Sequence, residues 1–176
     1  MNRKLAFIIV LLIGILSANI FAGVATANQT VTIQIPKLEL CRINAIAVTL
    51  GVSLPAIAGD PFIGSVDNSS YIQWTCLNMT SARSISMDLN VNPPAGTALD
   101  LSFVKTGTFS GTAAGATSGG MTAGPTYSCA TAIGSGNTGT GATGIQLDYV
   151  LSITDTSLLT VGNTPITMTF TLTDSF

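Results

Sequence analysis

Apolar and polar side chains alternate with a period of two along most of the chain after residue 28. The clearest case is residues 165–173, in which threonines separate four large apolar side chains: Ile166, Met168, Phe170 and Leu172. Successive side chains of a strand point to opposite faces, so the large side chains share one face and the threonines the other. β-Branched threonine also favours extended backbone. The sequence therefore predicts a half-buried strand here.

Similar patterns predict further strands at residues 31–35, 71–76, 85–91 and 145–153. A longer apolar stretch at 38–50 is either a strand buried on both faces or a strand bent partway. Clusters of Gly, Pro, Asn and Asp separate these segments, and a helical period is nearly absent. About seven short strands of this kind predict an all-β fold, an immunoglobulin-like antiparallel two-sheet β-sandwich.

Residues 107–144 break the alternation because they are mostly Gly, Ala, Thr and Ser. Their sizeable apolar side chains are Phe109, Met121, Tyr127 and Ile133. Such a composition buries little surface, so we expect a long loop with at most one or two weak edge strands around residues 126–130. Whether it is only a flexible connection or a variable surface loop that contacts a partner or ligand stays open.

The amino terminus has the three-part pattern of a secretory signal peptide over residues 1–27. Arg3 and Lys4 precede an apolar run from Leu5 to Leu16, and small residues end at Ala27. The uninterrupted run is shorter than the roughly 20 residues of a membrane-spanning helix, so we expect cleavage rather than a retained anchor. The sequence thus predicts one domain, residues 28–176, that is secreted or displayed at the cell surface and not membrane-spanning.

The composition excludes several classes of function. The 176 residues include no histidine, which removes His-based catalytic pairs and the common zinc motifs. The six Lys and Arg residues form no basic stripe, so nucleic-acid binding is not expected. Without the signal, four basic side chains face eight acidic ones, a net charge of −4. Such a sparsely charged surface suits packing against other copies of the chain.

The remaining chemistry-bearing side chains do not form a recognisable catalytic or metal site. No two carboxylates are marked as an acid–base pair. Asp60 and Asp67 lie in turn-rich sequence, but their spacing fits no calcium motif. We therefore expect no enzyme activity, no metal and no cofactor. Trp74, the only tryptophan, lies two residues before Cys76 and projects to the same face, so we expect it to pack against a disulfide at Cys76 instead of binding a sugar.

Three cysteines follow the signal segment, and an exported chain is expected to form at least one disulfide. Cys41 and Cys76 lie on two predicted strands 35 residues apart, and we favour a bridge between them. Cys129, in the Gly-rich segment, would then be a free thiol or bond to another chain. Pairing of Cys76 with Cys129 is the alternative.

A family resemblance rests on the order of several features along the sequence. A signal peptide precedes a strand with Cys41, a Gly-Asp-Pro loop follows, and Tyr-Ile-Gln-Trp-Thr-Cys ends at Cys76 before the alternating strand 83–91. This order resembles the amino-terminal half of chaperone–usher pilins and of spore coat U type secreted proteins. The alternating carboxyl end is similar to the terminal pilin strand that a chaperone grips. The third cysteine, the Gly-rich middle and the roughly thirteen residues before Cys41 depart from the pattern.

The resemblance implies an incomplete immunoglobulin-like sandwich that borrows a strand from a neighbour, with a periplasmic chaperone as a further partner. Residues 31–35 alternate as a donated strand would, but Pro36 follows directly, so the segment is either donated or paired within its own domain. We expect a structural subunit of a fimbria-like fibre, coat or surface layer that joins copies of itself or related subunits through edge strands. The assembly residues would be Val31, Ile33, Ile35, Ile166, Met168, Phe170 and Leu172.

The alternative function belongs to a different class. It is a monomeric secreted adhesin, a glycan- or protein-binding module that uses the 107–144 segment.

Overall fold

The computed structural model describes residues 29–45 and 47–174. The signal peptide predicted at residues 1–27 lies outside these residues. The chain divides into two units, residues 1–34 and 35–176, and all the strands belong to the second unit.

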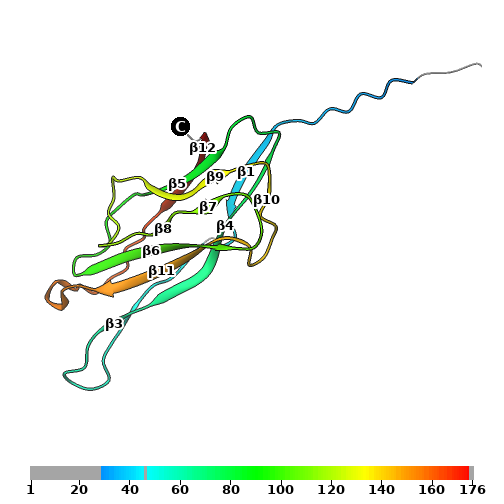
Figure 1. Cartoon of the computed structure of the whole chain (residues 1–176). Helices are drawn as coiled ribbons and strands as arrows, with labels where there is room; N and C mark the ends of the chain where they lie inside the picture. Colours follow the sequence, from blue (N-terminus) through cyan, green and yellow to red (C-terminus); the bar gives the residue numbers. More distant parts are fainter. Residues whose placement is uncertain (1–28, 46, 175–176) are drawn as a thin grey trace, which may run out of the picture. The chain divides into compact units, whose positions relative to one another are not determined.

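The described residues form antiparallel sheets (Figure 1). The larger sheet has the order β1–β4–β11–β6–β8, and β10 also pairs with β4. Its strands are β1 (Leu38–Ile43), β4 (Val66–Leu77), β6 (Thr97–Thr106), β8 (Gly115–Ala116), β10 (Gly136–Asn137) and β11 (Gly144–Ile153). The second sheet has the order β12–β5–β9–β7, with β5 (Arg83–Leu89), β7 (Thr112–Ala113), β9 (Tyr127–Ile133) and β12 (Met168–Asp174).

Two smaller elements complete the described chain. The strands β2 (Val52–Ser53) and β3 (Ile63–Gly64) pair as a hairpin, and Thr156–Leu158 form a short 3-10 turn, η2. The all-β, antiparallel part of the predicted fold is therefore confirmed. Its assignment to an immunoglobulin-like sandwich stays a prediction.

One hydrophobic core unites the two larger sheets. Alternate positions of β5 and β11 are buried, as the period-two pattern predicts, and the intervening side chains are more exposed. The core side chains of the central strands are Ile72, Trp74 and Cys76 of β4, Ile85, Met87 and Leu89 of β5, Leu99, Leu101 and Phe103 of β6, and Ile145, Leu147 and Tyr149 of β11. Burial of these side chains is the main stabilising contribution that the sequence pattern supplies.

Four of the predicted strands are present, namely those at 71–76, 85–91, 145–153 and 165–173, as β4, β5, β11 and β12. Residues 31–35 form no strand, and among the described residues of the stretch 38–50 only 38–43 do. The β1–β4 ladder ends at Asn44, because the Asn44 side chain takes the place of a backbone carbonyl as the hydrogen-bond acceptor. Its Oδ1 accepts a hydrogen bond from the Tyr71 amide at 2.6 Å.

The Gly-rich segment 107–144 is more ordered than the expected loop, since it contains β7, β8, β9 and β10. Strand β9 pairs with β5 on one side and β7 on the other, and it buries Cys129. Phe109 packs edge-on against Trp74, with ring centroids 4.9 Å apart. Gly111 has a φ of +121° and approaches Trp74 so closely that a Cβ would lie 3.3 Å from the ring. Small residues thus let this segment pack along the core although it lacks alternating large apolar side chains.

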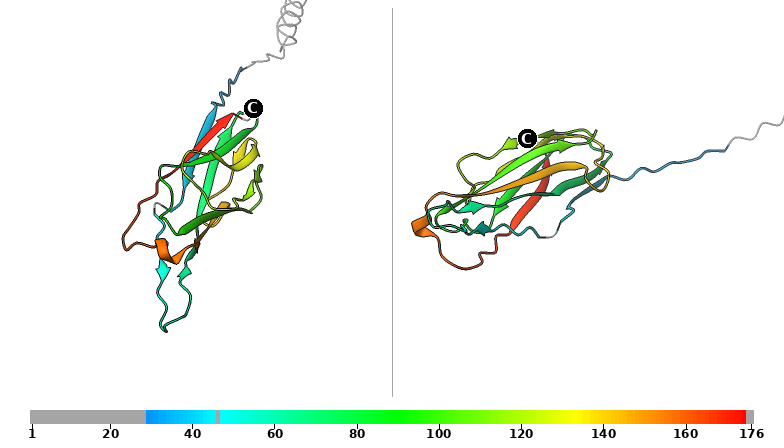
Figure 2. Two further views of the ribbon diagram at one scale, coloured as in Figure 1. Left: turned by 90° about the vertical axis from the view of Figure 1, so that its left-hand side faces the viewer. Right: turned by 90° about the horizontal axis from the view of Figure 1, so that it is seen from below.

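The β2–β3 hairpin is joined at its base to the end of β11. The Ser65 carbonyl accepts from the Leu151 amide at 3.0 Å, and the Ser65 hydroxyl accepts from the Gly51 amide at 2.8 Å. Gly64 lies against β11 so closely that a Cβ would be 1.8 Å from the Leu151 carbonyl oxygen. The loop of residues 54–62 projects beyond this base, at the lower end of the molecule in Figure 1 and in the left view of Figure 2.

We expect Gly64→Ala to lower the free energy of unfolding by about 1–3 kcal/mol, because the added methyl group must push the hairpin away from β11. Gly51→Ala is the matched control, since a Cβ at Gly51 meets nothing within 4 Å. Urea unfolding followed by Trp74 fluorescence measures the free energy of unfolding of each variant. Equal midpoints for the two variants would contradict the close contact of Gly64 with β11.

Candidate functional site at an open sheet edge

Strand β12 ends the second sheet with one backbone edge unpaired. It pairs with β5 in continuous antiparallel register, from Met168 opposite Leu89 to Asp174 opposite Arg83. Among the described residues no strand pairs with its other side. A row of exposed N–H and C=O groups on an edge strand is a template for pairing with another chain.

The inward side chains of this edge are incompletely covered. Ile166, Met168, Phe170 and Leu172 all pack against the core cluster, yet each is only partly buried, whereas the threonines between them are exposed. Equivalent positions on the neighbouring strand β5, such as Met87, are fully buried. The core is therefore closed on the β5 side and open beside β12.

Strand β1 is the edge of the larger sheet on the same side of the core. It pairs with β4 alone, and its inward side chains Cys41 and Ile43 are also only partly buried. An ion pair between Glu39 of β1 and Arg83 of β5, with 2.7 Å between Oε1 and Nη2, connects the two sheets here. The edges β1 and β12 therefore flank one partly uncovered strip of core, which we call the open edge.

The amino-terminal segment has apolar side chains without a strand partner. Val31, Ile33 and Ile35 are 72%, 80% and 61% exposed, and residues 29–35 form no strand. An exposed run of alternating large apolar side chains is costly in water. The described chain thus combines a partly uncovered sheet edge with an exposed strand-like segment, and the residues predicted for assembly lie at these two places.

The Arg83–Glu39 ion pair fixes the position of β1. The Arg83 side chain is 3% exposed, and its Nη1 also donates a hydrogen bond to the Ser81 Oγ at 2.8 Å. Lys37 approaches the same Glu39 oxygen at 2.8 Å. The Arg83 guanidinium, and after it the Lys37 ammonium, hold the pKa of Glu39 at about 2, below its usual 4.5. Sequence analysis missed this pair, because nothing in the pattern brings residues 39 and 83 together.

Glu39 should make part of the stability pH-dependent below pH 5. Its folded-state pKa is lowered, so its contribution is complete above about pH 4.5 and disappears as the pH falls toward 2. We expect Glu39→Gln to lower the Tm at pH 6 and to differ less from the unaltered protein at pH 2. Thermal unfolding by circular dichroism across this range measures the difference.

Lys37→Met is the matched control for that series. Lys37 is half-exposed, so its ion pair contributes little. This variant should keep most of the pH dependence. A difference between Glu39→Gln and the unaltered protein that stays constant from pH 6 to pH 2 would contradict the assigned role of Glu39.

The three cysteines, all thiols in this structure, lie on three strands. Cys41 of β1 is opposite Trp74 in the β1–β4 ladder and Cys76 is opposite Glu39, so Cys41 and Cys76 are diagonal neighbours on the core-facing side. Cys129 is buried on β9 of the other sheet. Burial raises the pKa of Cys41 to about 11 and that of Cys129 to about 12. The Cys41–Cys76 bridge stays a prediction, as does its alternative, Cys76–Cys129.

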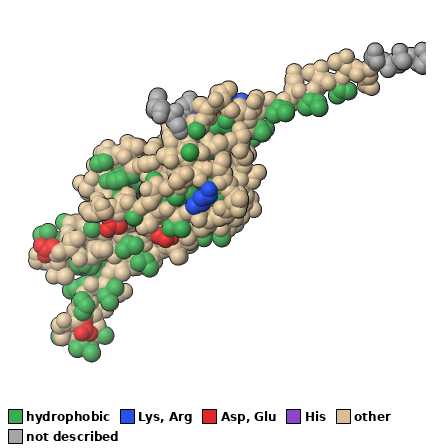
Figure 3. All heavy atoms as spheres, in the orientation of Figure 1, with side chains coloured by type: hydrophobic (Ala, Val, Ile, Leu, Met, Phe, Trp, Pro, Cys, Tyr) green, Lys and Arg blue, Asp and Glu red, His purple; other side chains and the backbone are tan. Residues whose placement is uncertain are grey.

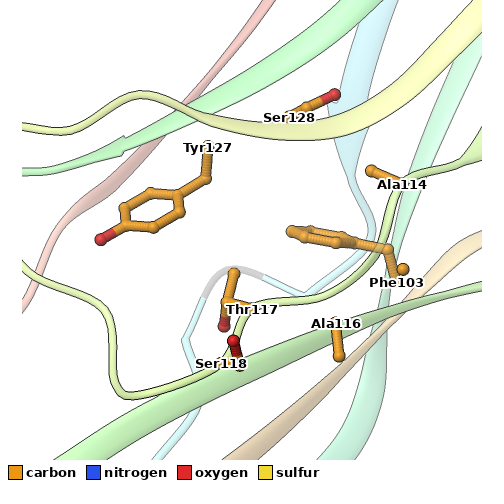
Figure 4. Close-up of a pocket in the computed structure, with 8 residues that line it drawn as sticks. Phe103, Ala114, Ala116, Thr117, Ser118, Tyr127 and Ser128 are labelled. Atoms are coloured by element: carbon orange, nitrogen blue, oxygen red, sulfur yellow. The ribbon is translucent and has the colours of Figure 1, made fainter.

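A pocket of about 310 Å³ lies where the Gly-rich segment approaches β6. Phe103 points toward Tyr127 in this pocket, with Thr117 beside them (Figure 4). None of its lining side chains is charged. The Tyr127 hydroxyl accepts from the Thr122 amide at 2.8 Å, which ties it to its own chain. The pocket therefore offers apolar surface and small hydroxyls, without an ionic group that would orient a ligand.

In the part of the chain that the structure describes, no helix is long and apolar enough to cross a membrane. Comparison with known proteins adds no assignment. No protein-family model, no curated protein and no solved structure matches the chain.

Proposed function

We propose that this chain is a secreted structural subunit of a fimbria-like fibre, coat or surface layer, and that it assembles by adding a strand of one copy to the open edge of the next. The observation that carries this proposal is β12, an unpaired edge strand whose inward side chains are packed on the core but only partly buried. A strand supplied by another copy would satisfy the backbone groups and cover these side chains together.

The strand order supports an immunoglobulin-like sandwich that lacks its last strand. In that fold, strands A, B, E and D form one sheet and C, F and G the other. Assigning β1, β4, β5, β6, β11 and β12 to A through F gives the order A–B–E–D in the larger sheet and F–C in the second. The position of strand G, beside F, is then the free side of β12.

Residues 29–35 have the properties that the missing strand needs. Their apolar side chains repeat with a period of two, so Val31, Ile33 and Ile35 would all face the uncovered core while Thr32 and Gln34 face water. Every ladder in the described residues is antiparallel, and antiparallel pairing is slightly more stable per residue than parallel pairing. We therefore infer antiparallel addition of this segment to β12.

Export and partners follow from the same proposal. The signal sequence at residues 1–27 would direct the chain out of the cytoplasm, and Pro36 would end the donated strand just before β1. Before assembly the open edge needs temporary cover, which a periplasmic chaperone would supply. The permanent partners are copies of this chain or related subunits.

The decisive experiment uses variants that are each defective on one side of the joint. Phe170→Asp with Leu172→Asp should block acceptance, and Ile33→Asp should block donation, because each places a carboxylate in the uncovered core. Each variant alone should lose polymer in size-exclusion chromatography with light scattering. An equimolar mixture should form a dimer and nothing larger, since only one productive joint remains.

Thr169→Ser and Thr171→Ser are the matched controls on the outward face of β12, and they should polymerise normally. Circular dichroism confirms that the Asp variants are folded. Polymer that survives both sets of Asp changes would overturn strand addition. A chain that is monomeric even without substitutions would favour the alternative, a monomeric binding module that uses the pocket of the 107–144 segment.

A further inference from the structure

The β2–β3 hairpin presents an apolar tip that strand addition does not use. Leu54, Ile57 and Ile63 are 80%, 69% and 61% exposed, and hydrophobic side chains gather over this projection in Figure 3. Asp60 is the only charged residue from 43 to 66. A cluster of this kind on a sparsely charged hairpin indicates a contact surface. The absence of Lys and Arg from it disfavours an anionic membrane surface as the partner.

The base of the hairpin is fixed, so its tip is held at a defined end of the molecule. Gly64 lies against Leu151 near the end of β11, and the adjoining backbone hydrogen bonds hold Ser65 to both Gly51 and Leu151. In the ladders, β11 ends where β6 begins, with Ile153 opposite Thr97. Figures 1 and 2 place the hairpin at this end, which we call the hairpin pole.

Strand β12 begins toward the hairpin pole and ends at the opposite pole. Its first residue, Met168, is opposite Leu89 at the end of β5, and its last, Asp174, is opposite Arg83. Arg83 in turn contacts Glu39 near the start of β1. Figure 1 shows the end of β12 and the start of β1 together at the upper end of the molecule. Strand β12 thus runs away from the hairpin pole.

The direction of β12 determines where the next copy lies. In antiparallel addition, the incoming segment ends near the start of β12, that is, toward the hairpin pole. Only Pro36 and Lys37 separate Ile35 from β1 of the incoming copy. Two residues span at most roughly 10 Å between flanking Cα atoms. The start of β1 of the incoming copy must therefore lie close to the hairpin of the accepting copy.

The start of β1 carries an apolar patch of its own. Leu38, Leu40 and Leu77 are 39%, 57% and 41% exposed, and Leu38 lies opposite Leu77 in the β1–β4 ladder. We call these three residues the leucine patch. Glu39, between Leu38 and Leu40, is paired with Lys37 and Arg83. Arg42 adds a further positive charge beside the patch, so basic groups are in excess here, whereas the hairpin carries Asp60. The two surfaces are thus complementary in both apolar character and charge.

We propose that the hairpin of each copy packs on the leucine patch of the next copy, as a second contact between neighbouring subunits. This proposal rests on antiparallel strand addition as the proposed function. Because the two surfaces are different and lie at opposite poles, the contact is head-to-tail and repeats along an open filament. It would restrain the angle between neighbouring subunits, which the short connector alone leaves adjustable.

A photo-crosslinking experiment on assembled full mature chain tests this contact. Benzoylphenylalanine at position 57 should give crosslinked pairs whose peptides contain residues 37–42 or residue 77 of another copy. The same probe at Val104, an exposed apolar position on β6, is the matched control and should give no such product. The probe at position 33 should crosslink to residues 166–174 of another copy, which reports strand addition independently.

The outcomes separate the two proposals. If position 33 crosslinks to β12 and position 57 does not reach the leucine patch, the hairpin contact is overturned and strand addition stands. If neither position crosslinks between copies, both proposals fail. Ile57→Asp supplies a second measurement, because it should leave strand addition intact and produce more strongly curved fibres in electron micrographs. Ile57→Leu should restore straight fibres, and equal curvature in all three proteins would also overturn the contact.

Discussion

The unpaired backbone edge of β12 is the constraint on which the rest of this structure depends. Backbone N–H and C=O groups at a sheet edge must be paired or hydrated, and water at that edge also reaches the partly buried side chains Met168, Phe170 and Leu172. Neither problem is solved within the described domain. The proposed association would therefore use the same groups that limit the stability of the domain.

The open edge is bounded by strands that are firmly held. On one side, β12 is paired along its whole length with β5, which is buried at alternate positions. On the other side, the ladder to β4 and the ion pair between Glu39 and the buried Arg83 position β1. If a strand is added as proposed, an edge that is already held in its binding geometry loses little entropy, so more of the contact energy appears as affinity.

The sequence predicted the local features of this arrangement better than the long-range ones. Alternation located β12 and placed Ile166 to Leu172 on one face, because a strand has only two faces. The alternation could not show that those side chains are only partly buried, since their burial depends on which strands are neighbours. The Arg83–Glu39 pair was missed for the same reason.

The Gly-rich segment and the hairpin show two other limits of pattern reading. Strand β9 reaches the core through small residues such as Ala130, so no alternation of large side chains marks it. The β2 and β3 strands are two residues each, too short for a periodic signal. The Gly-Asp-Pro turn and the scarcity of charge between Leu54 and Ile63 are what mark the hairpin in the sequence.

The start of β1 and the start of β12, where the added segment would leave the accepting copy, lie toward opposite poles, and this has a mechanical meaning. In a filament joined as proposed, tension would pull the added strand along its own axis, toward the hairpin pole, while the accepting domain is pulled the other way through the start of its own β1. The hydrogen bonds of the joint would then be loaded in shear and share the force, instead of opening one after another from an end. A joint without any covalent bond could in this way resist stretching far better than its equilibrium affinity alone indicates.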